Sequence, residues 1–104
     1  YSDDLADACV FLMERAHARD IGELINIGTG SELTIRELAE TVKAIVQFDG
    51  DLVFDASKPD GTPRKLLDTS RLTQLGWSPR VDLRRGVALA YADFVASHPH
   101  PALA

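Results

Sequence analysis

A short basic segment in the middle of the chain carries the residues best suited to chemistry. Residues 58–65 read Lys-Pro-Asp-Gly-Thr-Pro-Arg-Lys, so that Arg64 and Lys65 follow directly on a turn-forming stretch. Proline fixes φ and glycine permits positive φ, so this loop has few conformations to lose. A basic pair held on a stiff loop is suited to binding a phosphate group. Asp60 can accept hydrogen bonds from hydroxyls or ring nitrogens of the same ligand.

The same residues also fit an ordinary surface turn. Pro-Asp-Gly-Thr-Pro is a common turn sequence, and Arg-Lys pairs on protein surfaces usually face solvent without binding a ligand. Loop residues nevertheless carry function more often than core residues do. From the residue types alone, a phosphate-binding loop and a solvated turn both remain open.

The composition limits the partners of such a loop. The chain has 104 residues, a net charge of −5 and 45% hydrophobic residues, values typical of one soluble globular domain. An acidic chain is a poor match for nucleic acid. Most of the acids lie in residues 1–51, whereas most of the bases lie in residues 52–104 with the basic pair. This distribution favours a small anionic ligand over a polyanion.

The sequence predicts neither a membrane segment nor a metal site. It has no apolar run of about 18 residues, and its acidic start lacks the apolar region of a signal peptide, so we expect a cytoplasmic protein. The three histidines and the single cysteine show no metal-ligand spacing. Cys9 falls at an apolar helix position, which predicts a reduced, buried and inert thiol.

The first part of the chain is expected to form a helix and then a strand. Ser2 or Asp3 caps the helix, whose apolar residues cover so much of its circumference that further protein is expected to cover it. A strand over 23–27 ends at Gly28-Thr29-Gly30. These glycines either allow a tight connection or contact a nucleotide phosphate, although the third glycine of a dinucleotide-binding fingerprint is missing.

The remaining elements lead into and out of the basic loop. Thr34 and Glu37 form a capping box at the start of a second helix, and a second strand over 52–54 precedes the loop. Strand, helix and strand in this order predict a right-handed βαβ unit with parallel strands. Ligands gather where the strands of such sheets end. Asp68 and Asp82 are expected to cap the last two helices.

Several of these segments together resemble a known family. The opening Tyr1-Ser-Asp-Asp-Leu-Ala-Asp-Ala8, the turn Asn26-Ile-Gly-Thr-Gly30 and the helix start Thr34-Ile-Arg-Glu-Leu-Ala39 are similar to the C-terminal third of extended short-chain dehydrogenases/reductases. The loop segment 54–68, followed by Leu75-Gly-Trp77, is more specific. It resembles the GDP-L-fucose synthases, which are 3,5-epimerase/4-reductases acting on GDP-4-keto-6-deoxy-D-mannose. The resemblance covers nearly the whole chain.

This resemblance implies that the chain is the smaller part of a two-part enzyme. An N-terminal Rossmann domain outside the chain binds NADPH and carries the catalytic residues, while the C-terminal part closes over the GDP-sugar. No catalytic residue is expected within the chain, which has no Tyr-x-x-x-Lys motif. By motif match, Lys65 is a ligand of the GDP diphosphate and Asp60 is a second substrate contact. Arg64 is added to them because of its charge and position.

We therefore expect residues 1–104 to form a single α/β substrate-binding domain, a small lobe with about four helices and two or three short strands. Its partners would be a GDP-sugar and the N-terminal Rossmann domain of the same enzyme, in a parent protein that forms homodimers. Two alternatives remain open. The chain could be the same lobe of another nucleotide-sugar epimerase, dehydratase or reductase, or a stand-alone binding module without catalysis.

Overall fold

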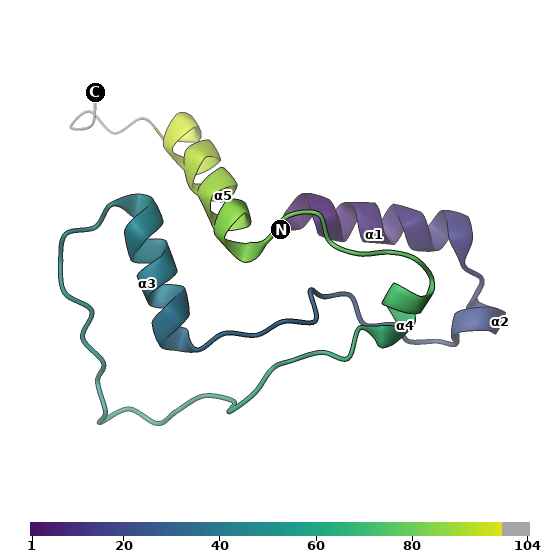
Figure 1. The fold of residues 1–104 in the computed structure, drawn as a ribbon, viewed down its shortest axis with the longest axis horizontal. Helices are drawn as coiled ribbons and strands as arrows, with labels where there is room; N and C mark the ends of the chain where they lie inside the picture. Colours follow the sequence, from purple (N-terminus) through teal and green to yellow (C-terminus); the bar gives the residue numbers. More distant parts are fainter. Residues whose placement is uncertain (99–104) are drawn as a thin grey trace. The chain divides into compact units, whose positions relative to one another are not determined.

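The computed structural model describes residues 1–98, which form five helices (Figure 1). The helices are α1 (Ser2–Arg15), α2 (Ala18–Ile21), α3 (Ile35–Val46), α4 (Ser70–Gln74) and α5 (Leu83–Ser97). The sequence also predicts a frayed end beyond His98, which lies outside the described residues.

The described chain divides into two compact units. The α1 unit consists of residues 1–32 and 60–81 and contains α1, α2 and α4. The α3 unit consists of residues 33–59 together with the described residues from 82 onward, and contains α3 and α5.

The predicted α/β class is wrong, because no residue from 1 to 98 belongs to a strand. The segments 23–27 and 52–54 are extended but form no backbone ladder. A strand is stable only when its N–H and C=O groups pair with a neighbouring strand. In segment 23–27 a side chain bonds to the neighbouring segment instead: Asn26 Nδ2 donates to the backbone oxygen of Asp68 at 3.1 Å. The βαβ unit that the sequence order favoured is therefore absent from the described residues.

The core of the α1 unit is small. Ala8, Leu72 and Trp77 are buried together, and Leu72 is only 1% exposed. Four partly buried apolar residues pack around these three: Phe11, Leu12, Ile25 and Ile27. The core thus joins one face of α1 to α4 and to the extended segment that follows α2.

Two acidic side chains of α1 attach this helix to the segment that follows α4. Asp4 is 8% exposed, and its Oδ2 accepts hydrogen bonds from the backbone nitrogens of Arg80 at 3.1 Å and Val81 at 2.9 Å. Asp7 Oδ2 accepts a hydrogen bond from Trp77 Nε1 at 2.8 Å. A buried carboxylate is costly unless it is hydrogen-bonded, so these contacts fix the register between the two segments.

The face of α1 that flanks its core face is apolar but exposed. Cys9 is exposed, so the prediction of a buried thiol is wrong. Its neighbours one turn away along the helix, Leu5 and Met13, are also exposed, Met13 by 84%. The helix starts at Ser2 with Tyr1 as its N-cap, so the predicted cap at Ser2 or Asp3 lies one or two residues too late. The sequence correctly predicted that α1 is apolar over much of its circumference, but it could not show which face of the helix other segments cover.

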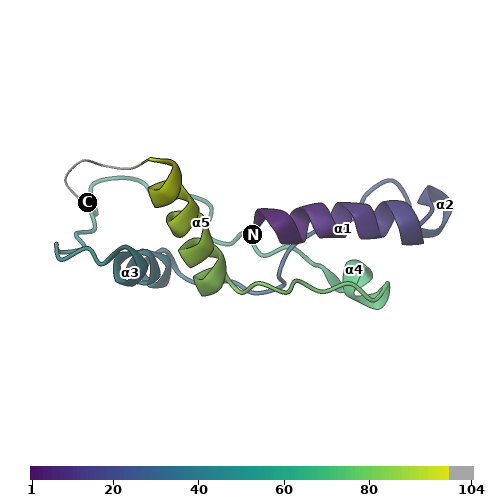
Figure 2. The ribbon, with the colours of Figure 1, turned by 90° about the horizontal axis from the view of Figure 1, so that it is seen from above.

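In the α3 unit, α3 packs against α5 (Figure 2). The predicted capping box is present: Thr34 Oγ1 accepts from Glu37 N at 3.2 Å, and Glu37 Oε2 accepts from Thr34 N at 2.7 Å. Asp82 caps α5 as predicted, because its Oδ1 accepts from Arg85 N at 2.8 Å. Both caps satisfy backbone N–H groups that the first helical turn leaves without partners.

Candidate functional site

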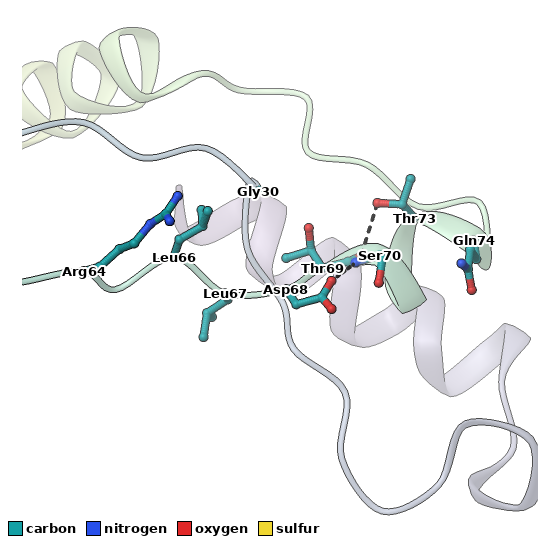
Figure 3. Close-up of a pocket in the computed structure, with 9 residues that line it drawn as sticks. All are labelled: Gly30, Arg64, Leu66, Leu67, Asp68, Thr69, Ser70, Thr73 and Gln74. Carbon is teal, nitrogen blue, oxygen red and sulfur yellow. Dashed lines mark hydrogen bonds between the residues drawn. The ribbon is translucent and has the colours of Figure 1, made fainter.

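An open groove of about 760 Å³ lies beside α4 within the α1 unit (Figure 3). Arg64 lies at one end of the groove in this view, and Thr73 and Gln74 of α4 lie at the other. Hydroxyl, amide and carboxylate groups line much of it, with two leucines between them. The lining residues are Gly30, Arg64, Leu66, Leu67, Asp68, Thr69, Ser70, Thr73 and Gln74.

The glycine turn after Ile27 packs closely against the segment before α4, and its Gly30 lines the groove. Gly30 has a φ of 71°, and a Cβ added to it would lie 3.0 Å from Thr69 Oγ1. A Cβ added to Gly28 would lie 3.4 Å from Thr69 Cγ2. A side chain at Gly30 would therefore be strained and would press against Thr69. Of the two roles considered for these glycines, the structure shows close packing of the turn against the segment before α4.

Arg71 of α4 hydrogen-bonds to the backbone at the end of α2 and just after it. Its Nη1 donates to the backbone oxygen of Leu24 at 2.8 Å, and its Nη2 donates to the backbone oxygen of Ile21. These contacts join residues about fifty positions apart in the sequence, and one of them satisfies the carbonyl of Ile21 at the end of α2. Arg71 is therefore a structural residue that holds the segment after α2 to α4, and it does not line the groove.

Arg64 is paired with a carboxylate that the sequence analysis did not single out. Its Nε lies 2.9 Å from Glu32 Oε2, and its Nη2 lies 2.7 Å from Glu32 Oε1. This two-point geometry is the strongest arrangement of an arginine and a carboxylate. The hydrogen bond to Glu32 raises the pKa of Arg64 above its ordinary value. The two residues are 32 positions apart, and no local sequence pattern marks a pair at that separation.

Asp60 and Lys65, the other two predicted site residues, do not line the groove. Both are exposed, and neither makes a hydrogen bond or an ion pair within residues 1–98. Arg64 alone of the three predicted site residues belongs to the groove lining. No contact within residues 1–98 bears on the substrate-binding roles of Asp60 and Lys65, which stay predictions.

The groove carries an anion of its own. Asp68 Oδ1 accepts a hydrogen bond from the backbone nitrogen of Ser70 at 2.9 Å, and hydrogen bonding from the side chain and backbone of Ser70 lowers the pKa of Asp68 below its ordinary value. Asp68 was predicted to cap α4. It does bind a nitrogen of the first turn, although the N-cap residue is Thr69. The groove lining therefore includes one cationic side chain, Arg64, and one carboxylate, Asp68.

Two classes of site find no support in the described residues. No group of histidine, cysteine, aspartate and glutamate side chains within residues 1–98 is arranged to hold a metal ion. Among the same residues, no helix is both long and apolar enough to cross a membrane.

The chain is similar in sequence to part of several curated enzymes. It is 58% identical over 89 residues to GDP-L-fucose synthase 1 of Arabidopsis thaliana, a match that covers 86% of this chain and 27% of the plant enzyme. It is 50% identical over 99 residues to GDP-L-fucose synthase of Escherichia coli, covering 89% of this chain and 31% of the bacterial enzyme. The chain therefore spans less than a third of these two relatives. No family model matches it.

Two solved structures from Campylobacter jejuni share the fold. A GDP-6-OMe-4-keto-L-xylo-heptose reductase aligns with a TM-score of 0.87 at 38% identity, over 93% of this chain and 30% of that structure's chain. A GDP-mannoheptose C4 reductase with NADP bound aligns with a TM-score of 0.78 at 38% identity, over 89% of this chain and 29% of that structure's chain.

The fold of this chain is thus that of a segment of GDP-sugar reductases. The sequence matches narrow the relationship further. The chain is homologous to a segment of the GDP-L-fucose synthases, which confirms the resemblance seen in its glycine turn and its basic loop.

Proposed function

We propose that this chain is the substrate-binding part of a cytoplasmic NADP-dependent epimerase/reductase that converts GDP-4-keto-6-deoxy-D-mannose to GDP-L-fucose. The observation that carries the proposal is the identity of 50 to 58% with GDP-L-fucose synthases over most of the chain. The open groove with Arg64 at one end supports it, because a nucleotide sugar needs both an anion-binding group and polar groups for its hydroxyls.

In this proposal the residues of the basic loop bind the charged part of the substrate. Lys65 contacts the diphosphate, Arg64 adds a second positive charge, and Asp60 accepts hydrogen bonds from the substrate. Lys65 is exposed and makes no hydrogen bond or ion pair within residues 1–98, so it has no intramolecular anion to give up on binding. A charge-assisted contact of this kind contributes about 1.5–3 kcal/mol once it is shielded from water.

The described residues do not fit NADPH. A dinucleotide-binding turn needs glycines that leave room for the pyrophosphate, and here the space beside Gly30 is already taken by Thr69. We therefore propose that an N-terminal Rossmann domain outside this chain holds the cofactor and the catalytic residues. The parent enzyme is proposed to be a homodimer.

A second candidate function is reduction of another GDP-sugar. The two solved relatives are named for reactions on GDP-heptoses, and each is 38% identical to this chain. Because this identity is lower, the heptose-reductase function is less well supported than the fucose-synthase function. The two functions predict different substrates for the same loop.

The test is a substrate comparison on a full-length synthase that carries this chain. GDP-4-keto-6-deoxy-D-mannose and NADPH should yield GDP-L-fucose, with a kcat/KM well above that for a 4-keto GDP-heptose and for the dTDP-linked analogue of the deoxysugar. Preferred turnover of the heptose would support the second candidate. Preferred turnover of the dTDP-sugar would contradict both.

A further inference from the structure

The pairing of Arg64 with Glu32 joins two loops that the sequence separates. Glu32 follows the glycine turn, and Arg64 follows the second proline of the basic loop. Two oxygens of Glu32 meet two nitrogens of Arg64, at 2.7 and 2.9 Å. Arg64 lines the groove, whereas Glu32 is not among the lining residues. The carboxylate therefore holds the guanidinium without itself lining the groove.

We infer that Glu32 is a positioning residue for substrate binding, which holds Arg64 so that the rest of its guanidinium faces an anionic group of the nucleotide sugar. This inference rests on the proposed function. The guanidinium has five N–H donors in a fixed plane. The pair with Glu32 uses the Nε edge and one side of Nη2. The remaining donors, on Nη1 and on the other side of Nη2, form a second two-point edge that fits a phosphate.

Holding Arg64 in place before the substrate binds would reduce the side-chain entropy that is lost on binding. Arg64 lies on an exposed loop, and its side chain remains 68% exposed even when paired. A free arginine side chain must lose its rotamer freedom when it binds a ligand, which weakens binding by about two- to tenfold. Glu32 removes part of that freedom beforehand. An exposed ion pair adds little to folding stability, so the main effect of the pair is expected in binding.

The experiment is steady-state kinetics with the GDP-sugar on a full-length synthase carrying this chain. Glu32→Gln keeps the size of the side chain but removes its charge, and it is expected to raise KM about three- to tenfold. The value of kcat should change little, because the contact is proposed to be the same in the ground and transition states. Glu32→Asp keeps the carboxylate, so its KM should fall between those of the wild type and Glu32→Gln.

Two controls separate positioning from other effects. Glu23→Gln makes the same charge change at an exposed residue of the same unit whose side chain has no partner in the described chain, and it should leave KM unchanged. In an Arg64→Met background, Glu32→Gln should have no further effect, because the residue it positions is gone.

The outcomes are distinguishable. An unchanged KM in Glu32→Gln overturns the inference, as does a lowered KM, which would make Glu32 a competitor of the substrate for Arg64. An equal rise in KM in the Arg64→Met background would also overturn it, since Glu32 would then act without Arg64. If neither Arg64→Met nor Lys65→Ala changes KM, the proposed role of the basic loop fails, independently of Glu32.

Discussion

At the scale of single residues, the basic loop contains two adjacent cationic side chains, Arg64 and Lys65, that differ in their surroundings. Arg64 is already bound to Glu32, whereas Lys65 makes no hydrogen bond or ion pair within residues 1–98. Binding a ligand through Lys65 therefore breaks no contact that the described chain makes. This difference suggests a division of roles, in which Lys65 supplies charge and Arg64 supplies geometry.

Replacing Lys65 by alanine should weaken substrate binding in a full-length synthase. We expect KM for the GDP-sugar to rise by about one to two orders of magnitude, which corresponds to the loss of one shielded charge-assisted contact. The control is Lys58→Ala, which removes the same charge at the start of the same loop and should have a small effect. Equal effects of the two variants would mean that only the total positive charge of the loop matters.

Single residues also show the limits of what the sequence could predict. The pattern of α1 indicated a helix that is apolar over much of its surface, but Cys9 was assigned to the buried face and is exposed. The period of a helix shows that two faces exist, and the partner that covers one of them is set elsewhere in the chain. The sequence analysis also missed Glu32, because its partner Arg64 lies 32 residues away and no local pattern links the two.

At the scale of elements, caps were predictable and strands were not. A cap joins residues three positions apart, so that Thr34 with Glu37, and Asp82 with the first turn of α5, could be recognised from sequence. Gly76 follows the C-cap of α4, Leu75, with a φ of 97°. A strand needs a distant partner to complete its hydrogen bonds. The segments 23–27 and 52–54 have strand-like sequences without such a partner in the described residues.

The capping box of α3 should make the stability of this helix depend on pH. Hydrogen bonds from the backbone and then the side chain of Thr34 lower the pKa of Glu37 below its ordinary value of 4.5. A carboxylate whose pKa is lowered by folding stabilises the folded state above its ordinary pKa, and this contribution is lost as pH falls through the lowered value. Stability from the box should thus be complete at neutral pH and decline below about pH 4.5.

Glu37→Gln tests this pH dependence, because glutamine can still accept the backbone hydrogen bond but does not titrate. The free energy of unfolding should fall less on acidification in this variant than in the wild type, and a carboxyl NMR titration of Glu37 should give a value below 4.5. Glu40→Gln, at an exposed position of the same helix, is the matched control. The same acid dependence in the wild type and in Glu37→Gln would show that the box does not contribute.

The glycine turn offers a second test at this scale. Gly30→Ala places a side chain at a φ of 71° and within 3.0 Å of Thr69 Oγ1, and should lower the free energy of unfolding by about 1–2 kcal/mol. Gly61→Ala is the control, because a Cβ added there meets nothing within 4 Å. Chemical denaturation of both variants measures the difference. Equal stability of the two would mean that the turn moves away from Thr69 at no cost.

At the scale of the whole chain, apolar surface exceeds what the described residues cover. The buried core consists of Ala8, Leu72 and Trp77, whereas Met13 on α1 is 84% exposed and Val53 is 87% exposed. Exposed apolar residues in this number usually mark surfaces that another protein segment covers. The chain spans 27 to 31% of the two synthases to which it was compared. We therefore expect the remaining polypeptide of a full-length synthase to cover part of this surface.

The 104-residue chain produced alone should consequently self-associate. The exposed stripe of Leu5, Cys9 and Met13 can bury itself against a second copy, so that the apparent mass should rise with concentration in analytical ultracentrifugation. Met13→Glu places a charge within the stripe and should shift the chain toward monomer. Ala18→Glu adds the same charge at an exposed position on α2 and should leave the association unchanged. A wild-type chain that stays monomeric and melts cooperatively would show that this apolar surface needs no cover, because the small core of the α1 unit would then suffice for stability.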